Sequence, residues 1–269
     1  MSAAHLVLPN FNPVAISIGP IDVRWYSLAY ITGILLGWFM LKTANDKDKI
    51  MSEEALENWL IWAILGIIIG GRLGYILFYN LGYYLYNPFQ ILAVWEGGMS
   101  FHGGLLGAII AMVLFCNKYK IKFLKLTDIL AVAAPIGLFF GRISNFINLE
   151  LYGRVTESKF GVIFPNGGSL PRHPSQLYEA SLEGILSFII LFYLAKFTKI
   201  KQTSGALSGL FLVLYGLSRM FVELFREPDE HIGLLFGYNI TMGQILSIPL
   251  IIIGLVTMAI AKGNSKTID

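Results

Sequence analysis

Apolar stretches about as long as a membrane is thick recur along this chain of 269 residues. A helix needs roughly 20 predominantly apolar residues to cross about 30 Å of hydrocarbon. Seven stretches approach that length, and they cover residues 26–41, 58–79, 99–116, 128–146, 180–196, 204–224 and 241–261. Charged residues make up only 14% of the chain, against roughly 25% in soluble domains. The pattern predicts an all-α integral membrane protein with seven transmembrane helices.

The residues before the first apolar stretch lack the pattern of a cleavable signal peptide. A signal peptide begins with basic residues, which a short apolar core follows. Here the first arginine or lysine is Arg24, and three prolines precede it. We therefore expect residues 1–25 to form an extracytoplasmic arm and residues 145–180 a small extracytoplasmic cap. The whole chain, residues 1–269, is expected to be a single polytopic membrane domain.

The lysines indicate how the chain is oriented. Twelve of the thirteen follow the first, third, fifth and seventh apolar stretches: Lys42, Lys47, Lys49, Lys118, Lys120, Lys122, Lys125, Lys196, Lys199, Lys201, Lys262 and Lys266. Short loops rich in lysine and arginine remain in the cytoplasm. The amino terminus is therefore expected outside the cell membrane and the carboxyl terminus in the cytoplasm.

The seven arginines avoid those cytoplasmic loops. Arg72, Arg142 and Arg219 lie inside outward-running stretches, roughly 6–12 Å below the outer surface at 1.5 Å per residue. An arginine in hydrocarbon costs roughly 2.5–3.5 kcal/mol even on the lenient insertion scale, and it usually marks a function. Its planar guanidinium suits phosphate or carboxylate. The shared depth favours a polar chamber that opens to the outer leaflet.

The sixth stretch adds a polar stripe to this picture. Its members lie within about an 80° arc of one helix, and they are Tyr215, Arg219, Glu223 and Arg226. A plain Arg219–Glu223 pair, four residues apart, is the alternative explanation, because such a pair neutralises itself between helices.

His102 stands among glycines at the outer end of the third stretch, in "WEGGMSFHGG". Glycine permits tight turns and close approach of backbones. The histidine is either a catalytic group or a polar residue at a helix start. Tyr26 has two explanations as well, an interfacial aromatic residue or a hydroxyl that faces the chamber. In "PRHPSQLYEA" we favour a helix start, with Ser175 at or near the cap.

Several classes of function lose support from what the sequence lacks. No His, Cys or carboxylate cluster has the spacing of metal ligands, and there is no Walker loop, so we expect neither a metal nor a cofactor. The basic residues form short loop clusters, which speaks against nucleic acid. The H-x4-D pattern of acyltransferases is missing, and "ALSG" at 206–209 lacks the first glycine of a rhomboid serine motif. The expected anionic partner of the chamber is a phospholipid head group.

The stretch "GRISNFINLELYGR", residues 141–154, resembles a family signature. That signature, G-R-x-[GA]-N-F-x-N-x-E-x-x-G, belongs to the phosphatidylglycerol–prolipoprotein diacylglyceryl transferases. The matching positions are Gly141, Arg142, Asn145, Phe146, Asn148, Glu150 and Gly153. Ser144 stands where the pattern has Gly or Ala, and we expect a slightly tighter helix contact there. "SFHGG", "GGRLGYILFYN", "RHPSQLYE", "YGLSRMFVELFREPD" and "MGQILSIP" are similar to other segments of that family.

The resemblance implies a reaction at the bacterial inner membrane. It is the transfer of a diacylglyceryl group from phosphatidylglycerol to the lipobox cysteine of a preprolipoprotein signal peptide, which forms a thioether and releases glycerol phosphate. By motif position it assigns catalytic roles to Tyr26, His102, Arg142, Asn145, Glu150 and Arg219. It assigns substrate binding to Arg142, Gly153, Tyr215 and Glu223. Spacing alone adds Arg72 and Arg226 to the substrate-binding set.

These residue types suit that chemistry. The thiolate is the nucleophile, and an imidazole such as that of His102 can accept a proton near neutral pH. Arg142 and Arg219 can stabilise the charge that grows on the leaving phosphate. Asn145 and Glu150 are expected to orient an arginine or the glycerol hydroxyls. A lipid transporter would place arginines toward both leaflets, and a structural scaffold would need none in the membrane.

Overall fold

The computed structural model describes residues 5–19, 21–228, 233, 235 and 240–265. The chain divides into two compact units, which are described here one after the other. The larger unit holds Met1–Leu41 and Thr127–Asp269, and the smaller unit holds Lys42–Leu126. Helix α1, Trp25–Asp48, begins in the larger unit and ends in the smaller.

Six helices among the described residues are long and apolar enough to cross a membrane: Trp25–Asp48, Glu53–Tyr79, Phe101–Tyr119, Phe123–Ile147, Ser175–Phe197 and Met242–Gly263. The predicted apolar stretch 204–224 corresponds to a shorter apolar helix, α8, of 17 residues. A helical, multi-pass membrane protein is thereby confirmed, whereas the count of seven spans and the orientation of the termini stay predictions.

The smaller unit consists of two long helices and a short connecting region. Its elements after α1 are α2 (Glu53–Tyr79), α3 (Leu81–Tyr86), η1 (Pro88–Leu92), η2 (Val94–Glu96) and α4 (Phe101–Tyr119). Glycines let α2 and α4 approach closely, because a Cβ on Gly74 would lie 2.7 Å from the Cα of Gly103. Small residues at such crossings are typical of membrane helices.

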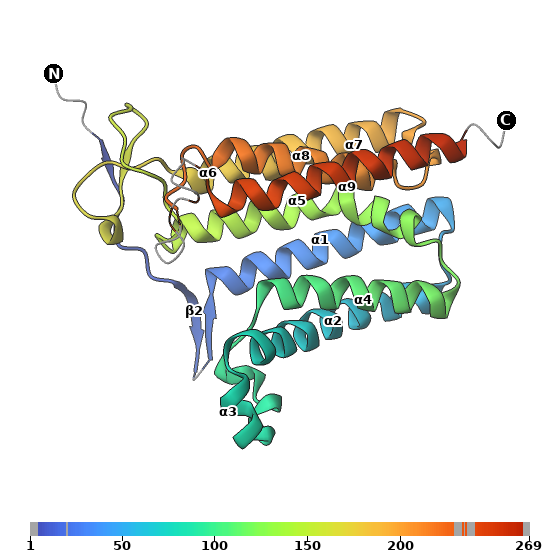
Figure 1. Ribbon diagram of the computed structural model, residues 1–269, viewed down its shortest axis with the longest axis horizontal. Coiled ribbons are helices and arrows are strands. Elements are labelled where there is room, and N and C mark those ends of the chain that lie inside the picture. Colours follow the sequence, from blue (N-terminus) through green and yellow to red (C-terminus); the bar gives the residue numbers. More distant parts are fainter. Residues whose placement is uncertain (1–4, 20, 229–232, 234, 236–239, 266–269) are drawn as a thin grey trace. The chain divides into compact units, whose positions relative to one another are not determined.

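The larger unit contains the remaining helices. They are α5 (Phe123–Ile147), α6 (Ser175–Glu179), the π-helical η4 (Ala180–Leu186), α7 (Ser187–Phe197), η5 (Ile200–Gln202), α8 (Ala206–Val222) and α9 (Met242–Ser265). Figure 1 shows α5, α7, α8 and α9 running alongside one another. A hydrophobic core of Val132, Leu191 and Leu207 joins α5, α7 and α8.

A buried carboxylate fixes the start of α8 against α5. Asp128 accepts hydrogen bonds from the backbone N–H of Gly205 at 2.7 Å and of Ser208 at 2.8 Å. The Ser208 hydroxyl donates to the same carboxylate at 2.7 Å. A carboxylate at a helix start satisfies free N–H groups and complements the helix dipole. This contact sets the register between α5, which carries Arg142 of the signature, and α8, which carries Arg219.

Short strands build the part of the larger unit outside its long helices. They are β1 (Leu6–Val7), β2 (Val14–Ile18), β3 (Ile21–Arg24) and β4 (Val162–Ile163), and η3 (Pro165–Gly167) is a short turn. β2 and β3 pair antiparallel, while β1 pairs parallel with β4. Leu8, Leu149, Val162 and Phe164 form a small hydrophobic core, to which β4 contributes Val162. This core ties the amino-terminal segment to residues 145–180, and the division of the chain into arm, cap and one membrane domain stays a prediction.

Candidate functional site

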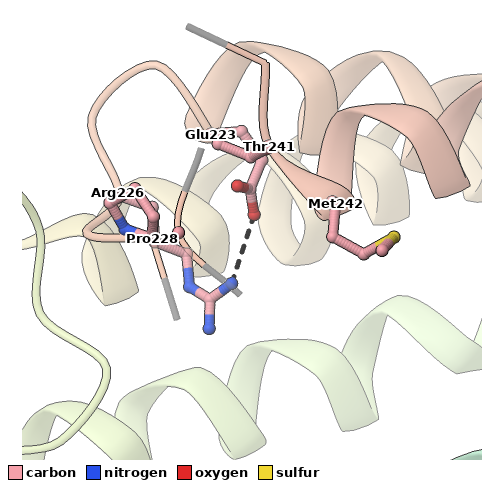
Figure 2. A pocket seen from close by; sticks show the side chains of 7 residues that line it. Glu223, Arg226, Pro228, Thr241 and Met242 are labelled. Atoms are coloured by element: carbon pink, nitrogen blue, oxygen red, sulfur yellow. Dashed lines mark hydrogen bonds and ion pairs between the residues drawn. The ribbon is translucent and has the colours of Figure 1, made fainter. Parts of the chain in front are cut away.

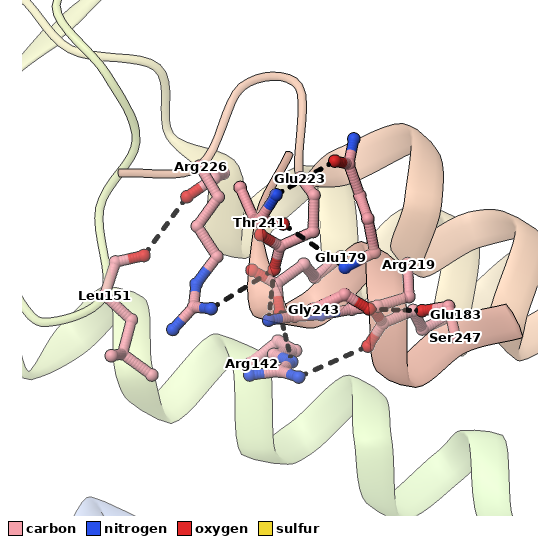
Figure 3. A network of polar contacts seen from close by, with 12 residues as sticks. Arg142, Leu151, Glu179, Glu183, Arg219, Glu223, Arg226, Thr241, Gly243 and Ser247 are labelled. Carbon is pink, nitrogen blue, oxygen red and sulfur yellow. Dashed lines mark hydrogen bonds and ion pairs between the residues drawn. The ribbon is translucent and has the colours of Figure 1, made fainter. Parts of the chain in front are cut away.

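Three arginines and three glutamates meet in the larger unit, as Figure 3 shows. We call this group the ion-pair cluster. Its members are Arg142 from α5, Glu179 from α6, Glu183 from η4, Arg219 from α8, and Glu223 and Arg226 from the segment that follows α8.

Glu179 is the centre of the cluster. Its Oε2 lies 2.7 Å from Nε of Arg142 and 2.9 Å from Nη1 of Arg219. The carboxylate side chain is fully buried, with 0% exposure. A buried carboxylate is tolerated only when it is well paired, so Glu179 needs both guanidinium groups and holds them at fixed positions.

Glu183 repeats this arrangement one turn further along. Its Oε2 lies 3.4 Å from Nη2 of Arg142, and its Oε1 lies 3.9 Å from Nη1 of Arg219. Both acids project from the junction of α6 with the π-helical segment η4. A π-helical turn inside a longer helix is rare and is frequent at functional sites. The hydroxyl of Ser187 supports the segment by donating to the carbonyl of Leu182 at 2.8 Å.

Sequence reasoning did not assign a role to Glu179 or Glu183. From the sequence alone, Glu179 belongs to a helix start, and Glu183 is one residue of the apolar stretch 180–196. Their four-residue spacing inside apolar sequence was the available signal, because Arg219 and Glu223 have the same spacing. Two unexplained acids in a membrane segment call for basic partners as much as unexplained arginines call for acidic ones.

The stripe predicted on the sixth stretch exists as a chain of ion pairs. Arg219 Nη2 pairs with Glu223 Oε1, and Arg226 Nη1 lies 3.2 Å from the same oxygen. Tyr215 stacks on Phe211, with ring centres 6.1 Å apart. The simple Arg219–Glu223 pair is therefore present, but it is one link of a larger set.

Charges and exposure divide the cluster into two sides. The three glutamates are 0–2% exposed, whereas the side chains of the three arginines are 12–19% exposed. Three positive and three negative groups leave the cluster formally neutral. The carboxylates thus lie behind the guanidinium groups, and the accessible side presents hydrogen-bond donors suited to an oxyanion.

A small cavity of about 10 Å³ adjoins the cluster at Glu223 and Arg226 (Figure 2). Its volume is that of about one water molecule. Thr241 and Gln244 begin α9 beside it with reciprocal hydrogen bonds of 3.1 and 3.2 Å, which is the pattern of a capping box. Gly243 makes room for the acid, because a Cβ there would lie 2.5 Å from Cδ of Glu223.

The signature asparagine and glutamate form a second polar group at the carboxyl-terminal end of α5. Nδ2 of Asn145 donates to Oε1 of Glu150 at 2.8 Å and to the hydroxyl of Tyr26 at 3.5 Å. Asn145 is buried and Glu150 is exposed. The structure therefore brings together Tyr26, Asn145 and Glu150, and their catalytic roles stay predictions.

The backbone around Glu150 is strained. Leu149 and Leu151, its two neighbours, have φ values of 58° and 56°. Left-handed backbone in a residue other than glycine costs about 1–3 kcal/mol and gathers at functional sites. Gln176 holds the turn by donating to the carbonyl of Glu150 at 2.6 Å, and Ser175 by donating to that of Leu151 at 3.1 Å. Glu150 thus lies between two strained residues, and its carboxylate accepts the hydrogen bond from Asn145.

Gly153 is required by packing. Its N–H donates to the carbonyl of His173 at 2.8 Å, and a Cβ at this position would lie 2.8 Å from the Cβ of His173. The next N–H, of Arg154, donates to the carbonyl of Phe225 at 2.8 Å. Residues 153–154 thus join the segment after α5 to the segment after α8. Partial burial lowers the pKa of the His173 imidazole, whose Nδ1 lies 3.2 Å from the Tyr178 hydroxyl.

Two of the residues singled out from sequence lie in the smaller unit. Arg72 is 4% exposed, and its three guanidinium nitrogens donate to backbone carbonyls of Gln90, Ile91, Gly97 and Gly98. Its guanidinium also lies 5.1 Å from the centre of the Tyr84 ring. These contacts hold the Arg72 side chain in the structure of the smaller unit, and its role in substrate binding stays a prediction.

His102 is exposed at the start of α4, with its ring edge-on to Phe101 at 5.6 Å. Ser100 caps that helix through a hydrogen bond of 3.2 Å from the N–H of Gly103, so the cap is not the histidine. The assignment of His102 as a base stays a prediction. Within the part of the chain that the structure describes, no three His, Cys, Asp or Glu side chains are grouped as metal ligands.

Comparison with known proteins gives consistent similarities over nearly the whole chain. Residues 13–260 match the family model of prolipoprotein diacylglyceryl transferases. The chain is 53% identical over 262 residues to the phosphatidylglycerol–prolipoprotein diacylglyceryl transferase of Rickettsia felis, which covers 97% of this chain and 100% of that protein. The protein of the same name from Rickettsia typhi is 52% identical with the same coverage. The one from Rickettsia africae is 54% identical over 250 residues, 93% of this chain and 96% of that protein.

Proposed function

Because the chain belongs to the prolipoprotein diacylglyceryl transferase family, we propose that it transfers the diacylglyceryl group of phosphatidylglycerol to the lipobox cysteine of preprolipoproteins. The products are a thioether on the cysteine and free glycerol phosphate. The observation that carries this proposal is the arrangement of the ion-pair cluster, whose arginines are partly exposed in front of fully buried carboxylates.

The proposed setting is the bacterial inner membrane, which the chain crosses seven times with its amino terminus outside. The seventh span is α8, whose 17 residues reach the lower end of the roughly 17–25 residues that suffice for a crossing. Twelve of thirteen lysines then lie on the cytoplasmic side, as topology rules require. The ion-pair cluster in this arrangement faces the outer leaflet.

The reaction exchanges one bond for another. The cysteine thiol gives its proton to a base, and the thiolate attacks the glyceryl carbon that is bonded to the phosphate oxygen. The C–S bond forms as the C–O bond breaks, and the electron pair of the C–O bond goes to the phosphate oxygen. The lipid phosphate carries one negative charge before this step, and the leaving glycerol phosphate carries one more.

The arginines are suited to that increase in charge. Arg142 and Arg219 share Glu179 as a partner, so both guanidinium groups are held at fixed positions before the lipid arrives. Donors that are fixed in advance, in a site with little water, stabilise a developing oxyanion more than flexible ones. Arg226 extends the same side of the cluster through Glu223. We assign the binding and stabilisation of the leaving phosphate to these three arginines.

The remaining roles follow from the second polar group and from motif position. Glu150, fixed by Asn145 beside Tyr26, can accept hydrogen bonds from the hydroxyls of the glycerol head group. His102 enters as the base through its motif position alone. Glu223 keeps Arg219 in place, Tyr215 enters the substrate-binding set through its motif position alone, and Gly153 keeps the outer segments together.

Mass spectrometry tests the proposal directly. The purified full chain, incubated with phosphatidylglycerol and a lipobox peptide, is expected to add one diacylglyceryl group to the cysteine and to release one glycerol phosphate per peptide. A matched peptide with serine in place of cysteine is the control and stays unmodified. An unmodified cysteine peptide, under conditions in which the Rickettsia felis relative modifies it, would contradict the proposal and favour a lipid-binding or transport role.

A further inference from the structure

Glu183 is the glutamate of the ion-pair cluster to which the proposed reaction gives no role. Its side chain is fully buried, with 0% exposure, and it pairs with Nη2 of Arg142 at 3.4 Å and with Nη1 of Arg219 at 3.9 Å (Figure 3). The distances from Glu179 to the same two side chains are 2.7 and 2.9 Å. Glu183 is therefore the more loosely paired of the two acids, although both share the same arginines.

One carboxylate oxygen of Glu183 has no hydrogen-bond donor. Among the described residues, none donates to its buried Oε1, and the same is true of Oε1 of Glu179. A carboxylate oxygen that is buried without a donor loses the hydrogen bonds that it would make to water. Buried ionisable groups that are poorly paired avoid this cost by becoming neutral. A proton on Glu183 would also have an acceptor, because Oε1 of Glu179 lies on the preceding turn and lacks a donor.

The ionisable groups around Glu183 come from three elements. They are Arg142 from α5, Glu179 from α6, and Arg219 from α8, where Tyr215 lies one turn earlier. Glu223 is linked to this group through Arg219. Helix α9 packs against α8, and it has no charged residue before Lys262. The charge on Glu183 is therefore balanced by two arginines, for which a second carboxylate competes.

The arrival of a lipid phosphate changes this balance. The three arginines of the cluster already pair with three glutamates, and a phosphodiester brings one further negative charge. An unbalanced charge in a site with little water is costly. Binding one proton restores neutrality, and at Glu183 the proton replaces the longest ion pairs of the two acids that share Arg142 and Arg219.

We propose that Glu183 binds a proton when the phosphate of the lipid reaches Arg142 and Arg219, and that it releases the proton when glycerol phosphate departs. The inference rests on the proposed function for the identity of the anion, and it adds a proton to the binding step. The proton comes from water, binds a carboxylate oxygen of Glu183 and returns to water, so no covalent bond of the lipid changes in this step. Glu183 acts through the two arginines and is a positioning residue. Once it is neutral, both guanidinium groups keep Glu179 as their shared partner and direct their other donors to the phosphate.

Calorimetry counts this proton without relying on turnover. Dihexanoyl phosphatidylglycerol is titrated into the full-length protein in detergent near neutral pH, in two buffers that differ in their enthalpy of ionisation. The phosphodiester of this lipid keeps a single negative charge throughout the neutral range, so the lipid itself neither takes up nor releases a proton. An uptake that approaches one proton per bound lipid is expected. Binding without uptake, or a failure to bind, would overturn the proposal.

Glu183→Gln tests whether Glu183 is the group that takes up the proton. The amide has the same shape and cannot bind the proton, so the uptake is expected to fall to near zero and the Kd for the lipid to become independent of pH. In the wild-type chain the Kd is expected to rise by about tenfold per pH unit above neutrality, because one proton is bound with each lipid. Glu227→Gln is the matched control, since Glu227 pairs with Arg172 outside the cluster and is 45% exposed. It is expected to keep the wild-type uptake and pH dependence.

Infrared difference spectroscopy supplies a second readout. When the lipid binds, the C=O band of a protonated carboxylic acid is expected to appear in the wild-type chain and to be missing in Glu183→Gln. Equal proton uptake in the wild type and in Glu183→Gln would assign the proton to another group and overturn the proposal. An equal loss of uptake in Glu227→Gln would overturn it as well, because that glutamate lies outside the cluster.

The outcomes separate this proposal from the proposed function. If the wild-type chain bound the lipid with proton uptake at Glu183 but transferred no diacylglyceryl group, the proposed function would fail and the assignment of Glu183 would stand. If the chain transferred the group without proton uptake, the proposed function would stand and the assignment of Glu183 would fail.

Discussion

Arg72 and Arg142 are alike in sequence and differ in their partners. Each lies inside an apolar helix, within about eight residues of its predicted outer end. Arg72 is almost fully buried, and it donates to four neutral backbone carbonyls. Arg142 is 19% exposed, and its partners are two carboxylates behind it. The role of an arginine in a membrane helix is therefore indicated by its partners and by the exposure of its guanidinium group, more than by its depth.

The largest effect is expected at the ion-pair cluster. Arg142→Ala removes a fixed donor from the leaving phosphate, and kcat is expected to fall by about 10²–10³-fold. Arg142→Lys keeps the charge but loses the planar fork, so it is expected to recover only part of the loss. Turnover of the lipobox peptide measures both. Near-normal turnover of Arg142→Ala in folded protein would show that Arg142, like Arg72, has no catalytic role.

Arg72→Ala is expected to act on structure. Hydrogen bonds from a charged donor are each worth about 1.5–3 kcal/mol, and the variant loses several, so we expect a free energy of unfolding lower by about 3 kcal/mol or more. Hydrogen–deuterium exchange of residues 88–98 is expected to rise, while KM for phosphatidylglycerol in the folded fraction stays the same. A raised KM with unchanged exchange would instead support the predicted role of Arg72 in substrate binding.

Gly153→Ala tests a position that, like Arg72, is expected to act through packing. The added Cβ would lie 2.8 Å from the Cβ of His173, and such overpacking costs about 1–3 kcal/mol. We expect a lower melting temperature and reduced turnover, because the segments after α5 and α8 separate. Gly168→Ala is not a matched control, since Gly168 has a φ of +89°. Gly141→Ala is better, because nothing lies within 4 Å of a Cβ at that position. Equal effects of the two alanines would contradict a packing role for Gly153.

The smallest effect is a dependence of stability on pH. Burial lowers the pKa of His173 from its ordinary value of 6.5. The unfolded chain therefore binds a proton at a higher pH than the folded chain, and stability falls as the pH drops from 6.5 toward the lowered value. His173→Gln is expected to flatten this part of a stability–pH curve measured by thermal unfolding. An unchanged slope would show that another group is responsible.

Much of the helical layout could be predicted from hydropathy, but the helix ends could not. The apolar stretch 58–79 ends where α2 ends, yet α2 begins at Glu53, because Ser52 caps a polar first turn that lies before the apolar part. The stretch 26–41 likewise continues as helix to Asp48. Two-residue strands such as β1 and β4 are too short for any periodicity, so the fold of residues 145–180 was not accessible from sequence.

The site was predictable in its residue types and not in its pairing. The motif led to Arg142, Asn145, Glu150 and Arg219, because each is a fixed position of the family pattern or of a helical stripe. Their partners depend on tertiary contacts, and Glu179, which joins Arg142 to Arg219, lies forty residues from Arg219 in sequence. The loop carbonyls that bind Arg72 are invisible to residue patterns altogether, since every residue has a carbonyl.

The neutrality of the ion-pair cluster has a consequence for enzyme kinetics. A substrate that is itself a membrane component surrounds the protein at very high local concentration, so the site is never short of it. Tight ground-state binding would then gain nothing in rate and would slow the exchange of one lipid for the next. Arginines that already have carboxylate partners hold a resting phosphodiester weakly and respond to the extra charge of the leaving group. Under the proposed function, we therefore expect the three buried glutamates to shorten the residence time of a lipid at the site and to weaken inhibition by the surrounding anionic lipids.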